Sequence, residues 1–289
     1  MLDQANQLRE KMLIKQSDKP SKKTVKKTRV LAIASGKGGV GKSNFALNFG
    51  LSLIEQDKKV LILDVDMGFA NIDVLLDQIP RETIASMIEK DLAVRDIIEK
   101  GPNGLLFISG GNGFNELFRM DDHKLHKFFQ ELATLQGEVD YIILDTGAGL
   151  SYENLRFILA ADDVILVTTP EPTSITDAYS VVKMVHGKDP NVHMKLVVNQ
   201  CVSIKEGQQT ADNFTQAAAQ FLGKEIGALG SIPNDLHVPE AVKKQQPLLL
   251  VYPNSESALA IRQLTGEFLH LRVPYKLRLK GFIMKIFFK

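Results

Sequence analysis

The sequence predicts an α/β fold: a single three-layer domain in which helices cover both faces of one mostly parallel sheet. Two observations predict it. Short apolar runs rich in β-branched residues recur along the chain, and longer segments with helical periodicity separate them. The length of 289 residues fits one large domain or two small ones, so the repeated strand-then-helix pattern decides for one.

Each element is expected where its pattern is clearest. The expected strands are residues 30–35, 60–64, 105–109, 141–145, 164–168, 195–199 and 226–232. The expected helices are residues 44–56, 122–135, 174–186, 212–222 and 257–271. Most of the strands are apolar throughout, as strands covered on both faces are, and ligands of such sheets bind at the carboxyl ends of the strands. The chain therefore divides into a segment 1–29, a domain 30–271 and a segment 272–289.

Charge separates the two ends of the chain from the domain between them. Residues 1–29 carry nine Lys and Arg against three Asp and Glu, and residues 272–289 carry six Lys and Arg and no acid. Because the whole chain has a net charge of +1, the domain between them carries −11. An acidic body argues against a DNA-coating protein, and the basic ends are expected to meet an anionic or acidic partner.

Cysteine content and hydropathy exclude several classes of protein. The single cysteine, Cys201, excludes a disulfide framework, a thiolate zinc finger and an iron–sulfur cluster held within one chain. No run of 18 uncharged apolar residues occurs, and the N-terminus lacks the apolar core of a secretory signal. We therefore expect a cytoplasmic protein that does not span a membrane. His123 and His126 share a helical face, but no third ligand has a suitable spacing, so no metal other than Mg²⁺ is expected.

A phosphate-binding loop follows the first expected strand and precedes the first expected helix. Its residues are Gly36, Lys37, Gly38, Gly39, Val40, Gly41, Lys42 and Ser43, which match G-x-x-x-x-G-K-[ST]. The glycines allow backbone N–H groups to converge on phosphate oxygens, and the helix N-terminus adds positive potential. Lys42 is expected to neutralise the β- and γ-phosphates, and Ser43 to offer its hydroxyl to Mg²⁺.

Acidic residues end two further strands at the same edge of the expected sheet. Asp64 and Asp66 close one strand, and Asp145 closes another. Carboxylates there can hold Mg²⁺ or its water ligands and can orient an attacking water. A single Asp at such a position would more commonly be a helix cap, but three that face a phosphate loop favour phosphoryl-transfer chemistry.

These motifs together resemble those of the MinD/ParA group of deviant-Walker-A ATPases, over about residues 30–271. The resemblance rests on the extra lysine Lys37, on residues 64–71 (DVDMGFAN) and on residues 145–149 (DTGAG). It implies that Lys37 reaches the nucleotide of a partner subunit, so that two chains enclose two ATP molecules. It also implies that Asp66 positions the hydrolytic water, that Asp64 and Asp145 serve the Mg²⁺ shell, and that Asn71 lines the switch segment.

The expected base is adenine. A Ras-like GTPase requires an Asn-Lys-x-Asp motif, whereas the corresponding strand here ends in Asn199-Gln200-Cys201. By the same resemblance, Asn199 bonds adenine, and a turn with Pro233, Asn234 and Asp235 closes over the base. Taken alone, Asn199 would be as easily explained as a turn residue.

The C-terminal segment has the pattern of an amphipathic helix. At 100° per residue one face carries Leu279, Phe282, Ile283, Ile286 and Phe287, and basic residues lie opposite. Its composition predicts a helix that lies on an anionic inner membrane, and MinD-like proteins carry such a tail. The alternative is an ordinary last helix docked on the core. An ATP-dependent dimer would present two such helices and so bind the membrane more strongly.

The N-terminal segment carries a short motif before its lysine-rich linker. Residues 3–9 read DQANQLR and resemble an element at the start of FlhG (YlxH), the flagellar branch of the MinD-like group. The resemblance implies that this element stimulates the GTPase of FlhF. The residues expected to meet this partner are Asp3, Gln4, Ala5, Leu8 and Arg9. A frayed terminus without a partner is the alternative.

The expected function is therefore a Mg²⁺-dependent ATPase that works as a homodimerisation switch. It is expected to bind the cytoplasmic face of the membrane, to regulate the placement and number of flagella, and to contact FlhF and proteins of the flagellar switch ring (C-ring). Alternatives within the group are septum placement and DNA partition; no specific nucleic acid is expected because the body is acidic. A metallocluster ATPase would require interface cysteines that Cys201 alone cannot supply.

Overall fold

The computed structural model describes residues 27–66, 71–110, 122–149 and 151–270, together with Phe282 and Ile286. The strands are β1 (Arg29–Ser35), β2 (Val60–Val65), β3 (Glu99–Lys100), β4 (Leu106–Ile108), β5 (Tyr141–Thr146), β6 (Asp163–Thr168), β7 (Met194–Cys201) and β8 (Gly227–Pro233). The α-helices are α2 (Lys42–Ile54), α3 (Ile72–Leu75), α4 (Ile84–Lys90), α6 (Asp122–Ala133), α7 (Tyr152–Ala160), α8 (Pro172–Lys188), α9 (Ile204–Leu222), α10 (His237–Lys243), α11 (Leu248–Val251) and α12 (Glu256–His270). Two short 3₁₀ helices, η1 (Val94–Ile97) and η2 (Pro102–Gly104), flank β3.

The strands form one sheet in the order β3-β4-β2-β5-β1-β6-β7-β8. Every pairing is parallel except that of the two-residue β3 with β4. The predicted α/β fold with a mostly parallel sheet is confirmed. Because β2, β5 and β1 are neighbours, their carboxyl ends meet at one edge, where Asp64 of β2 lies in register with Asp145 of β5.

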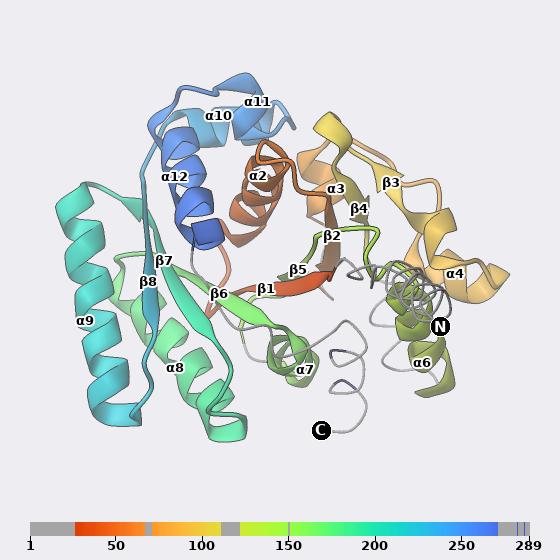
Figure 1. The fold of residues 1–289 in the computed structure, drawn as a ribbon. Coiled ribbons are helices and arrows are strands. Elements are labelled where there is room, and N and C mark those ends of the chain that lie inside the picture. The colour runs from red at the N-terminus through yellow and green to blue at the C-terminus, as the bar shows by residue number, and fades with distance from the viewer. Residues whose placement is uncertain are drawn as a thin grey trace, which may run out of the picture.

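Two hydrophobic cores lie on opposite faces of this sheet, as the alternation of side chains along β1 shows. Leu31 and Ile33 face the core formed with α2, α3 and α10–α12. Val30 and Ala32 face the core formed with α4 and α6–α9. The three layers are visible in Figure 1, where α2 and α12 lie above the sheet and α7 and α8 below it. Fully buried strands of this kind explain the continuous apolar runs of the sequence.

The helix boundaries differ from the expectation mainly at α9. It begins at Ile204, eight residues before the expected start, because Ser203 caps it. The Ser203 hydroxyl accepts a hydrogen bond from the N–H of Glu206, and the Glu206 carboxylate accepts one from the N–H of Val202. Ser203 followed by Glu206 three residues later is a sequence-level start signal that periodicity does not show, although the glutamate here accepts from the N–H of Val202 and not from that of Ser203. The elements α3, α4, α7, α10, α11 and β3 were not predicted, and all of them except α7 span about two turns or fewer, too little to show a period.

Candidate functional site

The phosphate loop connects the end of β1 to the start of α2, as the sequence predicts. Gly39 and Gly41 have φ of 82° and 85°, the left-handed region that side chains disfavour. A Cβ on Gly41 would also lie 2.5 Å from Nδ2 of Asn199, so a side chain there would displace that amide. The loop amides and the N-terminus of α2 border a cavity of about 470 Å³ at the carboxyl edge of the sheet.

Lys42 forms a buried ion pair at the inner end of this cavity. Its Nζ lies 2.5 Å from Oδ1 of Asp145, and the two side chains are 7% and 0% exposed. The second oxygen of Asp145, Oδ2, is buried without a hydrogen-bond partner. Nζ of Lys42 also lies 3.4 Å from the Ser43 hydroxyl, so the same ammonium contacts both groups. Mg²⁺ takes such oxygen ligands from one or two protein groups and from phosphates. Asp145 and Ser43 therefore fit the expected metal.

Asp64 has a different environment from the one expected of a metal ligand. Its Oδ1 accepts a hydrogen bond from the N–H of Asp66, and its Oδ2 accepts bonds from the N–H groups of Asn71 and Ile72. Burial, followed by the negative charge of Asp145, raises the pKa of Asp64 to about 7 although these N–H groups lower it. Both oxygens are engaged at the start of α3, so the geometry favours the helix-capping alternative for this residue.

Asp66 lies in the wall of the phosphate cavity, together with Lys37, Ser43 and Asn71. Asn71 lies at the start of α3, and its Nδ2 is 3.4 Å from Oδ2 of Asp66, which orients the Asp66 carboxylate. The arrangement places an acceptor for a water proton in the same cavity as the phosphate-binding amides. This is the geometry that a water-positioning role requires.

Lys37 is held by residues of its own chain that the sequence did not single out. Its Nζ lies 2.5 Å from Oε2 of Glu171 and donates to the Thr173 hydroxyl at 3.1 Å. Glu171 and Thr173 lie at the start of α8. No local spacing links them to the phosphate loop, from which they are more than 130 residues distant, so the sequence alone offered no signal for this contact.

A second cavity, of about 500 Å³, adjoins the phosphate cavity on the side of β7 and β8. All four residues expected to bind the base line it: Asn199, Pro233, Asn234 and Asp235. Gly41, Asn44 and Val242 line both cavities, so the two are contiguous. Apolar side chains such as Val238 and Ile261 complete the wall and were not predicted, because nothing local distinguishes them from core residues.

Hydrogen bonds fix the groups of this base side. Nδ2 of Asn199 donates to the Val40 carbonyl at 2.8 Å, so this side chain braces the phosphate loop. The Asp235 carboxylate accepts bonds from the N–H groups of His237 and Ser257. Burial raises the pKa of Asp235, but these bonds and the His237 side chain outweigh it and leave the pKa below its usual value.

The two terminal predictions fall mostly outside the described residues. Asp3, Gln4, Ala5, Leu8 and Arg9 lie outside them, as do Leu279, Ile283 and Phe287. Phe282 and Ile286 are described and are buried in the core on the α6–α9 face. The Phe282 ring meets that of Phe129 edge-on at 6.0 Å, and the Ile286 carbonyl accepts a bond from Nε of Arg156. These two side chains therefore adopt the docked alternative. Within the part of the chain that the structure describes, no helix is long and apolar enough to cross a membrane.

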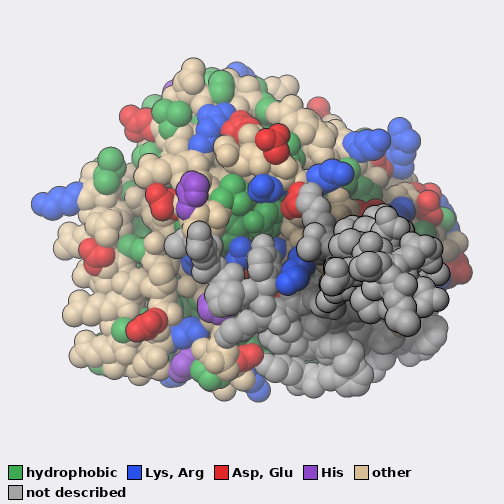
Figure 2. Space-filling model, in the orientation of Figure 1, with side chains coloured by type: hydrophobic (Ala, Val, Ile, Leu, Met, Phe, Trp, Pro, Cys, Tyr) green, Lys and Arg blue, Asp and Glu red, His purple; other side chains and the backbone are tan. Residues whose placement is uncertain are grey.

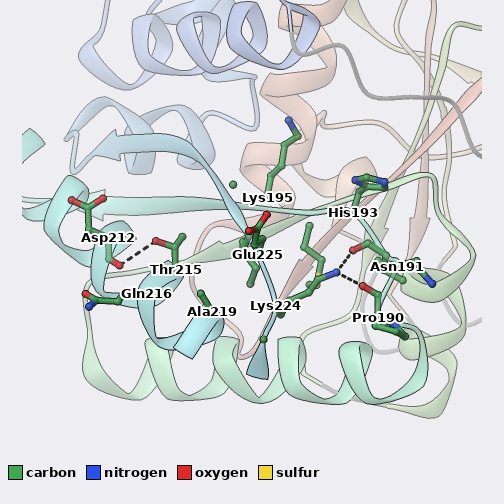
Figure 3. A pocket seen from close by; sticks show the side chains of 15 residues that line it. Pro190, Asn191, His193, Lys195, Asp212, Thr215, Gln216, Ala219, Lys224 and Glu225 are labelled. Atoms are coloured by element: carbon green, nitrogen blue, oxygen red, sulfur yellow. Dashed lines mark hydrogen bonds between the residues drawn. The ribbon is translucent and has the colours of Figure 1, made fainter. Parts of the chain in front are cut away.

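A larger cavity, about 1030 Å³, lies at the opposite edge of the sheet, by the amino ends of β7 and β8. Figure 3 shows its side chains, among them Lys195, Lys224 and Glu225. The Lys224 ammonium is already bonded to the carbonyls of Pro190 and Val192, each at 2.6 Å. Charges of both signs line the cavity, and none of the predicted site residues reaches it.

Comparison with known proteins identifies relatives along most of the chain. Residues 26–269 match the ParA family, described as NUBPL iron-transfer P-loop NTPase. The antiactivator FleN of Pseudomonas aeruginosa is 33% identical over 234 residues, 81% of this chain and 84% of FleN. The flagellum site-determining protein YlxH of Helicobacter pylori is 34% identical over 241 residues, 83% of this chain and 81% of YlxH. The septum site-determining protein MinD of Pyrococcus horikoshii, in complex with Mg-ADP, superposes with a TM-score of 0.69 at 26% identity, covering 83% of this chain and 96% of MinD.

Proposed function

The chain belongs to the ParA family of P-loop ATPases, the MinD/ParA group, and from that premise we propose that it is an ATP-dependent dimerisation switch that regulates the placement and number of flagella. The observation that carries the proposal is Lys37 beside a complete phosphate loop, in a chain a third identical to FleN and YlxH. YlxH is named for determining the flagellum site and FleN as an antiactivator, whereas the MinD relatives are named for septum placement.

ATP binding must rearrange the buried ion pair of the phosphate cavity. When Lys42 turns toward the phosphates, the carboxylate of Asp145 loses its positive partner inside the protein, which is costly. Mg²⁺, held by Asp145 and Ser43, would supply the replacing charge and neutralise the β- and γ-phosphates. Asp66 orients the attacking water, and the loop amides stabilise charge on the phosphoryl oxygens.

Dimerisation requires Lys37 to leave its own subunit's Glu171. The Lys37–Glu171 contact is partly exposed, with side chains 30% and 63% accessible, so water screens it and it is weak. A triphosphate on a facing subunit carries several negative charges and outcompetes one exposed carboxylate for the ammonium. ATP then acts as part of the interface between the two copies.

Membrane binding and FlhF stimulation belong to the two tails in this proposal. Phe282 and Ile286 must leave the core before the C-terminal segment can lie on the cytoplasmic face of an anionic membrane. The N-terminal residues Gln4 and Arg9 are the groups proposed to reach FlhF, and a C-ring protein is the proposed second partner. Figure 2 shows acidic and basic side chains interspersed over the described part of one face, which gives nucleic acid no continuous basic surface there.

An iron-transfer role, suggested by the description of the matched family, lacks a ligand set among the described residues. Cys201 is the chain's single cysteine and is buried, and burial raises the pKa of its thiol to about 11. A thiol of that kind is a poor metal ligand, because metals bind the thiolate. No group of three or more potential ligands occurs in the described part of the chain.

Sedimentation with a non-hydrolysable ATP analogue tests the switch. The unaltered chain is expected to sediment as a dimer, and Lys37→Ala as a single copy that still binds the analogue. A single copy for the unaltered chain would overturn the switch. The flagellar role is tested separately, by mixing the protein with FlhF and GTP with and without residues 1–20: equal GTP hydrolysis would overturn that role and leave the ATPase intact.

A further inference from the structure

Two glutamines adopt a backbone conformation that is unusual for their residue type. Among the residues that the structure describes, six other than glycine have φ between 50° and 59°. Four of these are Asp or Asn, which tolerate the left-handed region comparatively well. The other two are Gln200, which lines the base cavity, and Gln245, which follows two residues after Lys243 of that lining.

Gln245 follows α10 at the position where a helix usually ends with glycine. Its own N–H donates to the Val242 carbonyl, and the N–H of Gln246 donates to that of Ala241, which closes the helix end. Glycine would adopt this backbone without steric cost. A glutamine at such a position is explained if its side chain makes a contact that glycine cannot make.

The side chain of Gln245 makes such a contact across the nucleotide cleft. Its Nε2 donates to the carbonyl of Val74, in α3, at 2.9 Å. Val74 lines the phosphate cavity and Val242, three residues before Gln245, lines both cavities. In Figure 1, α3 lies on one side of α2 and α10 above its other side. The hydrogen bond therefore ties the two walls of the cleft together.

Gln200 makes an equivalent contact to the phosphate loop. Its Nε2 donates to the carbonyl of Gly39 at 3.2 Å, next to the bond from Asn199 to Val40. Each glutamine thus comes from the base side and donates to a carbonyl on the phosphate side. The two contacts have different partners and lie on different elements, so either can be removed alone.

We propose that Gln245 and Gln200 are positioning residues that clasp the base side of the cleft to α3 and to the phosphate loop, and so retain bound adenine nucleotide. They act through the carbonyls of Val74 and Gly39. Opening of the cleft for nucleotide release then requires the Gln245 bond to break, while the wall residues remain in place. This inference rests on the ATP site and is independent of the flagellar role.

Replacement of Gln245 by glycine separates a clasp from a merely structural residue. Gln245→Gly removes the side-chain bond but relieves the left-handed backbone, so the thermal midpoint should stay equal or rise. Release of a fluorescent ADP derivative, followed by stopped flow after mixing with excess ADP, should become about fivefold faster, as loss of one hydrogen bond predicts. Gln200→Gly should accelerate release by a similar factor.

Two controls make the result decisive. Asp57→Gly makes the same backbone change at the end of α2, away from the cleft, and should leave the release rate unaltered. Gln245→Lys keeps an N–H donor of similar reach and should retain most of the slow release. The proposal is overturned if Gln245→Gly releases ADP at the unaltered rate, or if Asp57→Gly accelerates release equally. Absence of ADP binding by the unaltered chain would instead refute the ATP site itself.

Discussion

The two halves of the nucleotide cleft are built from different kinds of interaction. On the phosphate side, charged groups are buried and paired with one another, as Lys42 is with Asp145. On the base side, neutral amide groups brace the loop through its carbonyls, and apolar side chains form the wall. In the proposed ATP site the first half must exchange partners when a nucleotide binds, whereas the amide groups of the second half already have their partners. The phosphate side therefore holds the ion-pair energy that nucleotide binding changes, and the base side fixes the shape of the cavity.

Two carboxylates carry the same contrast. Burial and Asp145 raise the pKa of Asp64 on the phosphate side, while hydrogen bonds from two N–H groups and His237 lower that of Asp235 on the base side. Both accept backbone N–H bonds, so the difference comes from the surroundings: Asp64 faces a second buried carboxylate, and Asp235 faces a histidine. Before nucleotide binds, the phosphate side therefore contains two buried carboxylates that repel each other when both are ionised. The base side contains no such repulsion at Asp235.

Removal of Lys42 should have the largest effect on the phosphate side. Lys42→Met leaves Asp145 buried without a counter-charge, so we expect the free energy of unfolding of the nucleotide-free protein to fall by about 3 kcal/mol, together with loss of ATP hydrolysis. Urea denaturation measures the first effect. Adding Asp145→Asn removes the stranded charge, so the double variant should be more stable than Lys42→Met alone.

The exposed pair of Lys90 and Glu82 provides the control for that experiment. These side chains are 55% and 27% exposed, so water screens the pair and Lys90→Met should cost much less stability than Lys42→Met. If Lys42→Met were no more costly than Lys90→Met, or if Asp145→Asn gave no recovery, the ion pair would not hold the energy assigned to it.

The pH dependence of stability should differ in sign between the two halves. A carboxyl with a pKa of about 7 in the folded state and 3.8 in the unfolded state binds more protons when folded throughout that interval. The stability that protonated Asp64 contributes is therefore lost as pH rises from about 4 to 7. Relative to Asp64→Asn, the nucleotide-free protein should lose up to about 1.4 kcal/mol of unfolding free energy per pH unit in that window.

Asp235→Asn is the matched variant on the base side. Because the pKa of Asp235 is lowered, its contribution is present above about pH 4 and is lost as pH falls, the reverse of Asp64. Urea titrations between pH 3 and pH 8 compare the two. A difference between the protein and Asp64→Asn that does not vary with pH would show that the pKa of Asp64 is the same in the folded and unfolded states, and the contrast would disappear.

The sequence predicted the phosphate loop more completely than the groups that reach the cleft from other elements, for a physical reason. The phosphate loop needs its glycines, Lys42 and Ser43 at fixed spacing on one turn, so a local motif records them. Val242, Gln245 and Glu171 reach the site from distant elements, and contacts such as that of Gln245 with Val74 span 171 residues. Their residue types are ordinary where they stand, so only the fold shows what they meet.

The predicted fold was confirmed because buried parallel strands leave a strong apolar pattern in the sequence. Periodicity alone could not decide what covers the apolar face of the C-terminal segment. Phe282 and Ile286 satisfy the pattern of a membrane helix and that of a docked helix equally well. The structure buries both of them against the α6–α9 face. An amphipathic pattern states which side chains avoid water, and it does not state what covers them.

The smallest expected effect concerns Asn199, which joins the two halves. Asn199→Ala removes the bond to the Val40 carbonyl and frees space beside Gly41, so the phosphate loop loses one neutral brace and no charge. We expect ADP affinity, measured by calorimetry, to fall about fivefold. Gln208→Ala deletes a similar amide on the exposed face of α9, where it bonds only Asp212, and should leave affinity unaltered. If Asn199 also bonds adenine, its removal should reduce the preference for ADP over GDP. An equal loss of affinity for both nucleotides would restrict its role to bracing the loop. No loss of affinity for either nucleotide would mean that the loop carbonyls need no brace from the base side.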